Sequence, residues 1–345
     1  MAYTIIDDPS AYFHTQLFTG NGSTQSITNN ANSGDFKPDW LWTKSRGSDH
    51  GHGIFDSNRG GNARLDTSAT QEERTNEGNV TFQTNGFNVT SSHPTTNNSS
   101  TNMVAWQWIA NGGTTANNTS GDIGTSVVQA NTTVGISIVL YTGNNTGGST
   151  VGHGLGGVPE WIIAKSRAAA KPWVVYHVGM GNTKSIKLNA TDAAATDSSS
   201  WGNTTPSSTT FTLGNGDSNH TGTMLAYCFR SIQGYSKFGS YTGNGDANGA
   251  FVYTGFKPAW LMVKRSSDAQ GWIIWDSKRD TFNIADAPLT ASESSGEDNK
   301  EVDLLSNGFK FRSADTATNA ASTYIYMCFA SSPLVGSDGT PCTAR

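Results

Sequence analysis

The sequence of 345 residues is poor in charge, and the charge it carries is nearly balanced. Only 14% of the residues are charged, and 22 basic against 27 acidic side chains give a net charge of −5. There is no basic cluster of the kind that neutralises nucleic-acid phosphates. No apolar run approaches a membrane span, and the opening MAYTIIDDPS lacks the basic start and apolar stretch of a signal peptide. We therefore expect neither nucleic acid nor a membrane as a partner.

Cysteine is also scarce, with three residues in the whole chain. Cys228 and Cys328 lie 100 positions apart within apolar runs, where a thiol acts as a small buried hydrophobe. Cys342 lies in a polar terminal stretch and is expected to be free. The sequence therefore predicts no disulfide framework.

Motifs of covalent or metal chemistry are missing as well. The nucleophile motif Gly-x-Ser-x-Gly does not occur. The histidines lack the spacing and the cysteine partners of a zinc site, and the loop carboxylates do not by themselves define a glycosidase pair. These residues are His50, His52, His153, Glu72, Glu73, Glu297 and Asp298. We therefore expect a protein that is not an enzyme and that binds no cofactor and no metal. A depolymerase is kept as an alternative, ranked behind the non-enzymatic functions discussed below.

What the chain does contain is one motif written three times. Each copy has Pro, a spacer, Trp, an aliphatic residue, two further positions and Lys. The copies are FKPDWLWTK with Pro38, Trp40 and Lys44, GVPEWIIAK with Pro159, Trp161 and Lys165, and GFKPAWLMVK with Pro258, Trp260 and Lys264. Proline cannot donate to a sheet ladder, so each copy predicts a turn followed by a strand with a buried face.

The spacing indicates that whole units recur around this motif. Trp40 and Trp161 are 121 positions apart, as are Asp56 and His177, and the next interval is 99 for Trp161 to Trp260 and for His177 to Asp276. A constant offset across two elements is typical of a duplicated unit. Gly, Ser, Thr and Asn are abundant, and helical periodicity is weak. The predicted fold is all-β, with three repeated β-sandwich-like modules of ~100 residues in tandem.

The predicted boundaries follow the repeats. They are an N-terminal arm (1–10), β module 1 (11–112), a linker that can add a strand (113–135), β module 2 (136–232), β module 3 (233–331) and an exposed C-terminal tail (332–345). Residues 111–124, which are rich in Gly, Thr and Asn, are expected to be loose. Each module has one variable loop, and these are the segments 70–78, 191–201 and 292–301. We expect the tryptophans of the motif to build the core of each module, and the closing strands to have one core face and one wetter face.

Three residues are candidate ligand contacts. Asp56 and Asp276 end equivalent strands and can accept a sugar hydroxyl or help to hold a cation, although an Asp-Ser pair also closes a turn through local hydrogen bonds. The middle copy has His177 there, which favours the turn. Trp201, like Trp108, is either an exposed platform for a sugar or a buried core residue, and burial is favoured.

Long phrases of the sequence resemble a known repeat family. The matching phrases are GISIVLYTGNNTGGSTVGHGLGGVPEWIIAKSR, AYCFRSIQGYSKFGSYTGNGD, VYTGFKPAWLMVKRS, LSNGFKF and YIYMCFA. They are similar to a module found in virion structural and tail-fibre proteins of tailed bacteriophages, many of them marine or cyanobacterial. The opening residues 1–27 also resemble the start of phage structural proteins, whereas the first module lacks the GHGLG phrase.

The resemblance implies a non-enzymatic virion protein, made in the host cytoplasm and exposed on the particle surface as a tail-fibre or appendage component. It also implies contacts with other virion proteins and a homo-oligomer, with a trimer favoured. Because the sequence has no coiled coil or long fibrous repeat, a capsid decoration protein remains an alternative. A carbohydrate-binding adsorption protein that contacts host surface glycans is another, and no catalytic residue comes with the family.

Overall fold

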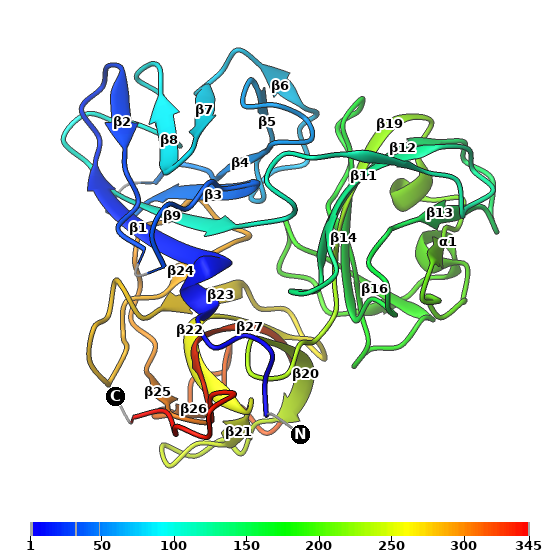
Figure 1. Cartoon of the computed structure of the whole chain (residues 1–345). Coiled ribbons are helices and arrows are strands. Elements are labelled where there is room, and N and C mark those ends of the chain that lie inside the picture. Colours follow the sequence, from blue (N-terminus) through cyan, green and yellow to red (C-terminus); the bar gives the residue numbers. More distant parts are fainter. Residues whose placement is uncertain (1–2, 32, 48, 344–345) are drawn as a thin grey trace.

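The computed structural model describes residues 3–31, 33–47 and 49–343, so the outermost two residues of the predicted arm and of the predicted tail lie outside the described residues. In this part of the chain nearly all regular structure is β, in antiparallel sheets that form three lobes (Figure 1). Each lobe is built on one large sheet, and the lobes are numbered first to third in chain order. The helical segments are single turns: η1 (Pro9–Ala11), α1 (Ser198–Trp201) and η2 (Asp217–Asn219). No described helix is long and apolar enough to cross a membrane. The predicted all-β class is confirmed.

The first large sheet has the strand order β1-β9-β3-β4. Its strands are β1 (Phe13–Thr19), β9 (Asn102–Trp108), β3 (Trp40–Ser45) and β4 (Gly53–Asp56). One face is covered by a small sheet of β2 (Gln25–Ile27), β8 (Gly86–Val89) and β7 (Val80–Gln83), and β5 (Ala63–Arg64) pairs with β6 (Arg74–Thr75). Leu41 and Phe55 meet Phe87 between the two layers and form a small core.

The second large sheet has eight strands. In order they are β10 (Ala116–Asn118), β11 (Ser126–Asn131), β12 (Ile136–Gly143), β19 (Gly222–Phe229), β14 (Trp161–Ser166), β15 (Val174–His177), β16 (Lys184–Lys187) and β17 (Ala195–Thr196). The pair β13 (Thr150–Gly152) and β18 (Thr210–Thr212) covers one face. Strands β10 and β11 come from the predicted linker. The expectation that residues 111–124 are loose is therefore wrong for residues 116–118, which pair with β11.

The third large sheet has the order β20-β27-β22-β23-β24. Its strands are β20 (Ser236–Thr242), β27 (Thr323–Pro333), β22 (Phe256–Arg265), β23 (Trp272–Asp276) and β24 (Leu289–Thr290). A small sheet of β21 (Phe251–Tyr253), β26 (Gly308–Phe311) and β25 (Val302–Leu305) covers one face, with Phe309 and Phe311 in the core between the layers.

The prolines of the motif behave differently in the three copies. Pro38 and Pro159 lie two residues before β3 and β14, as expected for a residue that cannot donate to the ladder. Pro258 lies inside β22, which is contrary to the prediction. The register with β27 shifts on both sides of Pro258, so an irregularity in the ladder absorbs its missing N–H.

The tryptophans of the motif do not fill separate cores, so that prediction is wrong. Trp40, Trp161 and Trp260 belong to one buried cluster formed by the faces of the large sheets that point away from their small sheets. Phe229 and Phe329 join the same cluster. Each large sheet is thus covered on both faces, by its own small sheet and by the other large sheets. This double coverage also buries Gln107 on β9, where a wetter face was predicted.

The described part of the arm lies against the third lobe, whereas residues 337–341 of the tail are exposed, as predicted. In the arm, Ile6 is buried in the shared core and the Thr4 hydroxyl donates to the carbonyl of Gln233 (2.9 Å). In the predicted exposed tail, the N–H of Cys342 donates to the carbonyl of Leu334 (2.8 Å). The Ser337 N–H donates to the Asp7 carboxylate (2.6 Å), so arm and tail also bind each other.

Candidate functional site

The lysines of the motif are buried where the lobes meet. Lys44, Lys165 and Lys264 are fully buried, and each ammonium donates to a backbone carbonyl in the variable loop of another lobe. The acceptors are Ser294 O (2.8 Å) for Lys44, Thr70 O (3.1 Å) for Lys165 and Thr191 O (3.2 Å) for Lys264. Burial penalises the charged ammonium and lowers the pKa of all three lysines to about 8.

These contacts run in one direction around the molecule. A backbone N–H in each variable loop donates to the second residue after the motif lysine of the neighbouring lobe. The pairs are Glu73 to Arg167 O (3.0 Å), Ala194 to Ser266 O (2.8 Å) and Glu297 to Arg46 O (2.8 Å). The first lobe therefore holds the second, the second holds the third, and the third holds the first. This makes a closed ring of three junctions.

Ion pairs reinforce two of the three junctions. The Glu73 carboxylate accepts from Nε and Nη2 of Arg167 (2.8 and 2.7 Å) and also from Arg59 (2.9 Å). The Glu297 carboxylate accepts from Arg46 in the same bidentate way (2.7 and 3.2 Å). In the loop of the second lobe the residue whose N–H makes this backbone contact is Ala194, so the junction between the second and third lobes has no matching pair.

Asp56 and Asp276, the candidate ligand residues, are buried inside these same two junctions. Asp56 accepts from Arg59 (2.5 Å) and from the Tyr227 hydroxyl of the second lobe (2.7 Å). Asp276 accepts from Arg279 (2.5 Å) and from the Trp106 indole of the first lobe (2.9 Å). Although burial opposes ionisation, the charge and hydrogen bonds of Arg279 hold the pKa of Asp276 below its usual value. Both carboxylates therefore bind protein groups and do not face solvent.

The third junction uses neutral residues at the same register positions. His177 pairs opposite Trp161 as Asp56 pairs opposite Trp40, and Met180 stands where the other copies have an arginine. Burial lowers the pKa of His177 to about 3, so the ring is neutral, and its Nδ1 accepts from the Gly179 N–H (2.8 Å). A buried charge pair is therefore replaced here by uncharged side chains.

The other predicted candidates are also structural. Trp201 is 1% exposed and packs edge-on against Tyr176 and Phe211, and Trp108 is fully buried, so neither offers a platform to a sugar. The His52 ring accepts from the Trp42 indole (2.8 Å) and faces carbonyls of the third lobe. Among the described residues no group of three His, Cys, Asp or Glu side chains could hold a metal ion. Cys228 and Cys328 are buried thiols, as predicted.

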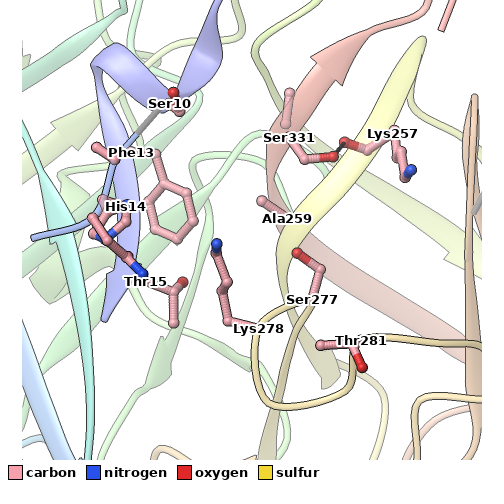
Figure 2. Close-up of a pocket in the computed structure, with 13 residues that line it drawn as sticks. Ser10, Phe13, His14, Thr15, Lys257, Ala259, Ser277, Lys278, Thr281 and Ser331 are labelled. Atoms are coloured by element: carbon pink, nitrogen blue, oxygen red, sulfur yellow. Dashed lines mark hydrogen bonds between the residues drawn. The ribbon is translucent and has the colours of Figure 1, made fainter. Parts of the chain in front are cut away.

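Sequence reasoning missed a pocket at the junction of the first and third lobes (Figure 2). This pocket, of about 330 Å³, lies between β1 and the strands and turn of the third lobe. Lys257 and Lys278 line it together with His14, and no Asp or Glu does. The hydroxyl of Thr15, a residue 4% exposed, is buried there without a hydrogen-bond partner. Its residues come from positions 10–31 and 257–331, so no local pattern in the sequence could reveal it.

Comparison with known proteins yields one match. Residues 8–333 match the model of a domain of unknown function, DUF7483. No curated protein matches the chain, and no solved structure matches it.

Proposed function

From the premise that this chain belongs to the DUF7483 family, we propose that it is a non-enzymatic structural protein of a tailed-bacteriophage virion. It acts on the particle surface as a component of a tail fibre or appendage. It is built from three tandem β-sandwich modules of ~100 residues. The likeness of its phrases to phage virion proteins supports the first statement, and the arrangement of the strands supports the last.

The strand registers agree with a threefold repeat. Within each large sheet the strand that carries the motif lies between a closing strand and a following strand. Trp40, Trp161 and Trp260 each face an aromatic residue of the closing strand, namely Trp108, Phe229 and Phe329. Each module is then a two-layer unit that cannot cover its large sheet fully alone and completes its core against the other two.

The closed ring of junctions is the observation that carries the proposed function. Buried lysines, two buried carboxylate–arginine pairs and a shared aromatic core lock the three lobes into one block. Such a block suits a protein that must keep its shape outside a cell. The candidate residues Asp56, Asp276 and Trp201 all contact other protein groups inside this block, which favours a structural role over catalysis.

The ring also bears on the predicted homotrimer. All three junctions are closed within one chain, so a trimer of chains must use other surfaces. We propose that such contacts, and those with other virion proteins or a host glycan, lie on the outer sheets and loops of the lobes.

Immunogold electron microscopy of purified particles tests the proposal. The expected result is labelling at tails or appendages by antibodies raised against the folded chain, with matching peptides in the mass spectrum of the particles. Labelling of the head would move the assignment to capsid decoration. Absence of the chain from particles of a phage that encodes it would refute the virion role.

A further inference from the structure

The pocket lies against the outer edge of β1. The corresponding strand edges in the other two large sheets are those of β12 and β20, and in the described structure only the edge of β1 is left open. At the two ends of β1, the Ile109 N–H donates to Tyr12 O (3.1 Å) and the Gly20 N–H donates to Thr101 O (2.9 Å). Since hydrogen-bonded and non-bonded pairs alternate in an antiparallel ladder, Phe13 and Thr15 direct their N–H and C=O groups away from β9. Neither residue has a backbone partner on that side within the described chain.

The two corresponding edges are covered. On β12 the residues at the same register, Ile136 and Ile138, pair with Asn131 and Gln129 of the added strand β11. On β20 the N–H of Ser236 donates to Ile232 O (2.9 Å). Further along β20 the N–H of Phe238 donates to the Ser231 hydroxyl (3.2 Å). The chain therefore supplies its own cover at two of these edges.

The turn after β4 shows how the cover is recognised. Ser57 Oγ donates to Oε1 of Gln129 on β11 (2.9 Å). Asn58 Nδ2 donates to the carbonyls of Val127 and Ile138 (3.1 Å each). Ser57 thus binds a side chain of the added strand, and Asn58 binds its backbone.

At the open edge the turn after β23 places Ser277 and Lys278 in the corresponding positions, and both line the pocket (Figure 2). In the described chain neither the Ser277 hydroxyl nor the Lys278 ammonium has a protein partner. The hydroxyl of Thr15 is buried without one. Lys278 stands at the position that Asn58 has in the turn after β4, so a cation takes the place of a neutral amide. Lys257 adds a second positive charge to the pocket.

We propose that this slot binds a short extended segment of a partner protein, which adds a strand to β1 and carries an Asp or Glu opposite Thr15. Main-chain hydrogen bonds to Phe13 and Thr15 supply the docking, as in other cases of strand addition. The carboxylate takes the place of the Gln129 amide and accepts from Ser277 and Lys278. The segment is short because the Gln16 side chain already donates to Leu17 O (2.9 Å), which closes the edge further along. The inference does not depend on the virion role.

The probe is a peptide with the sequence of residues 125–132 and the change Gln129→Glu, labelled and titrated into the full chain by fluorescence polarisation. The expected result is saturable binding that is weakened at least about tenfold when Lys278→Glu puts a like charge in the slot. The unaltered peptide should bind more weakly than the Glu form. Lys184→Glu, an equal charge change at an exposed site outside the pocket, is the matched control and should leave binding unchanged.

Two further measurements separate strand addition from other occupants. Peptide binding should slow hydrogen exchange at the N–H groups of Phe13 and Thr15, and Thr15→Pro should abolish binding while leaving the ladder with β9 intact. No saturable binding, equal binding by Lys278→Glu, or binding without protection of these amides would overturn the proposal. Preferential binding of an oligomer of glucuronic acid would assign the slot to acidic sugars instead. A concentration-dependent dimer that is lost in Lys278→Glu would assign it to a second copy.

Discussion

Replacing Arg59 by methionine tests how far a buried charge pair holds the lobes together. The Arg59 side chain is fully buried and donates to Asp56, to Glu73 and to the carbonyls of Ile54 (3.2 Å) and Ala63 (2.8 Å). Removing one partner of a buried ion pair leaves an uncompensated charge and typically costs about 3–5 kcal/mol. We expect Arg59→Met to lower the free energy of unfolding by an amount in that range.

The chain itself contains a matched control for this substitution. At the corresponding positions of the third junction it has His177 and Met180, and Met327 stands in register where Tyr227 stands. Transplanting these residues through Asp56→His, Arg59→Met and Tyr227→Met removes the stranded carboxylate together with its partners. We expect the triple variant to recover a large part of the stability lost in Arg59→Met, since a neutral set can replace a buried ion pair at small net cost.

Guanidinium unfolding followed by tryptophan fluorescence measures both effects, since all ten tryptophans are buried. The shared core predicts one cooperative transition for the three lobes. A loss below about 1 kcal/mol in Arg59→Met, as for an exposed pair, would refute the reasoning. So would a triple variant that is no more stable than the single one.

Three further predictions concern other parts of the ring. The pKa of Lys165 is about 8 in the folded chain against 10.5 when exposed, so the folded state loses this proton first and stability rises above pH 8. In Lys165→Met the free energy of unfolding should rise less steeply between pH 8 and 9, by up to about 1.4 kcal/mol per pH unit. Unfolding measured across that range gives the slope, and an unchanged slope would contradict the assignment. Trp161→Ala, which opens a cavity in the shared core, should cost about 3–5 kcal/mol, and melting of all lobes together at a lower temperature by calorimetry would verify it. Because burial raises the pKa of the Cys228 and Cys328 thiols, a thiol reagent at pH 8 should label Cys342 alone until denaturant is added, and mass spectrometry of labelled peptides gives the site.

The elements around the motif could be predicted because their cause is local. Proline cannot donate to a sheet ladder, and the Trp and aliphatic residues that follow it favour a strand, so the motif predicts where a strand begins; β3 and β14 begin at Trp40 and Trp161. The turn interpretation of Asp56 was also open to prediction, since its carboxylate accepts from the N–H of Arg59 three residues on (2.8 Å). What that carboxylate meets on its other side, the hydroxyl of Tyr227, lies 171 residues away and follows from no local rule.

The sequence alone determined the strand class, the spacing of the motif and the burial of Cys228 and Cys328, since each depends on side-chain preferences within a few residues. Only the tertiary structure decided that Trp40, Trp161 and Trp260 share one core, that the motif lysines bind loops of other lobes, and that β1 keeps an open edge. A strand pattern shows that a face will be buried but not what will cover it. The covering surfaces here come from distant parts of the chain.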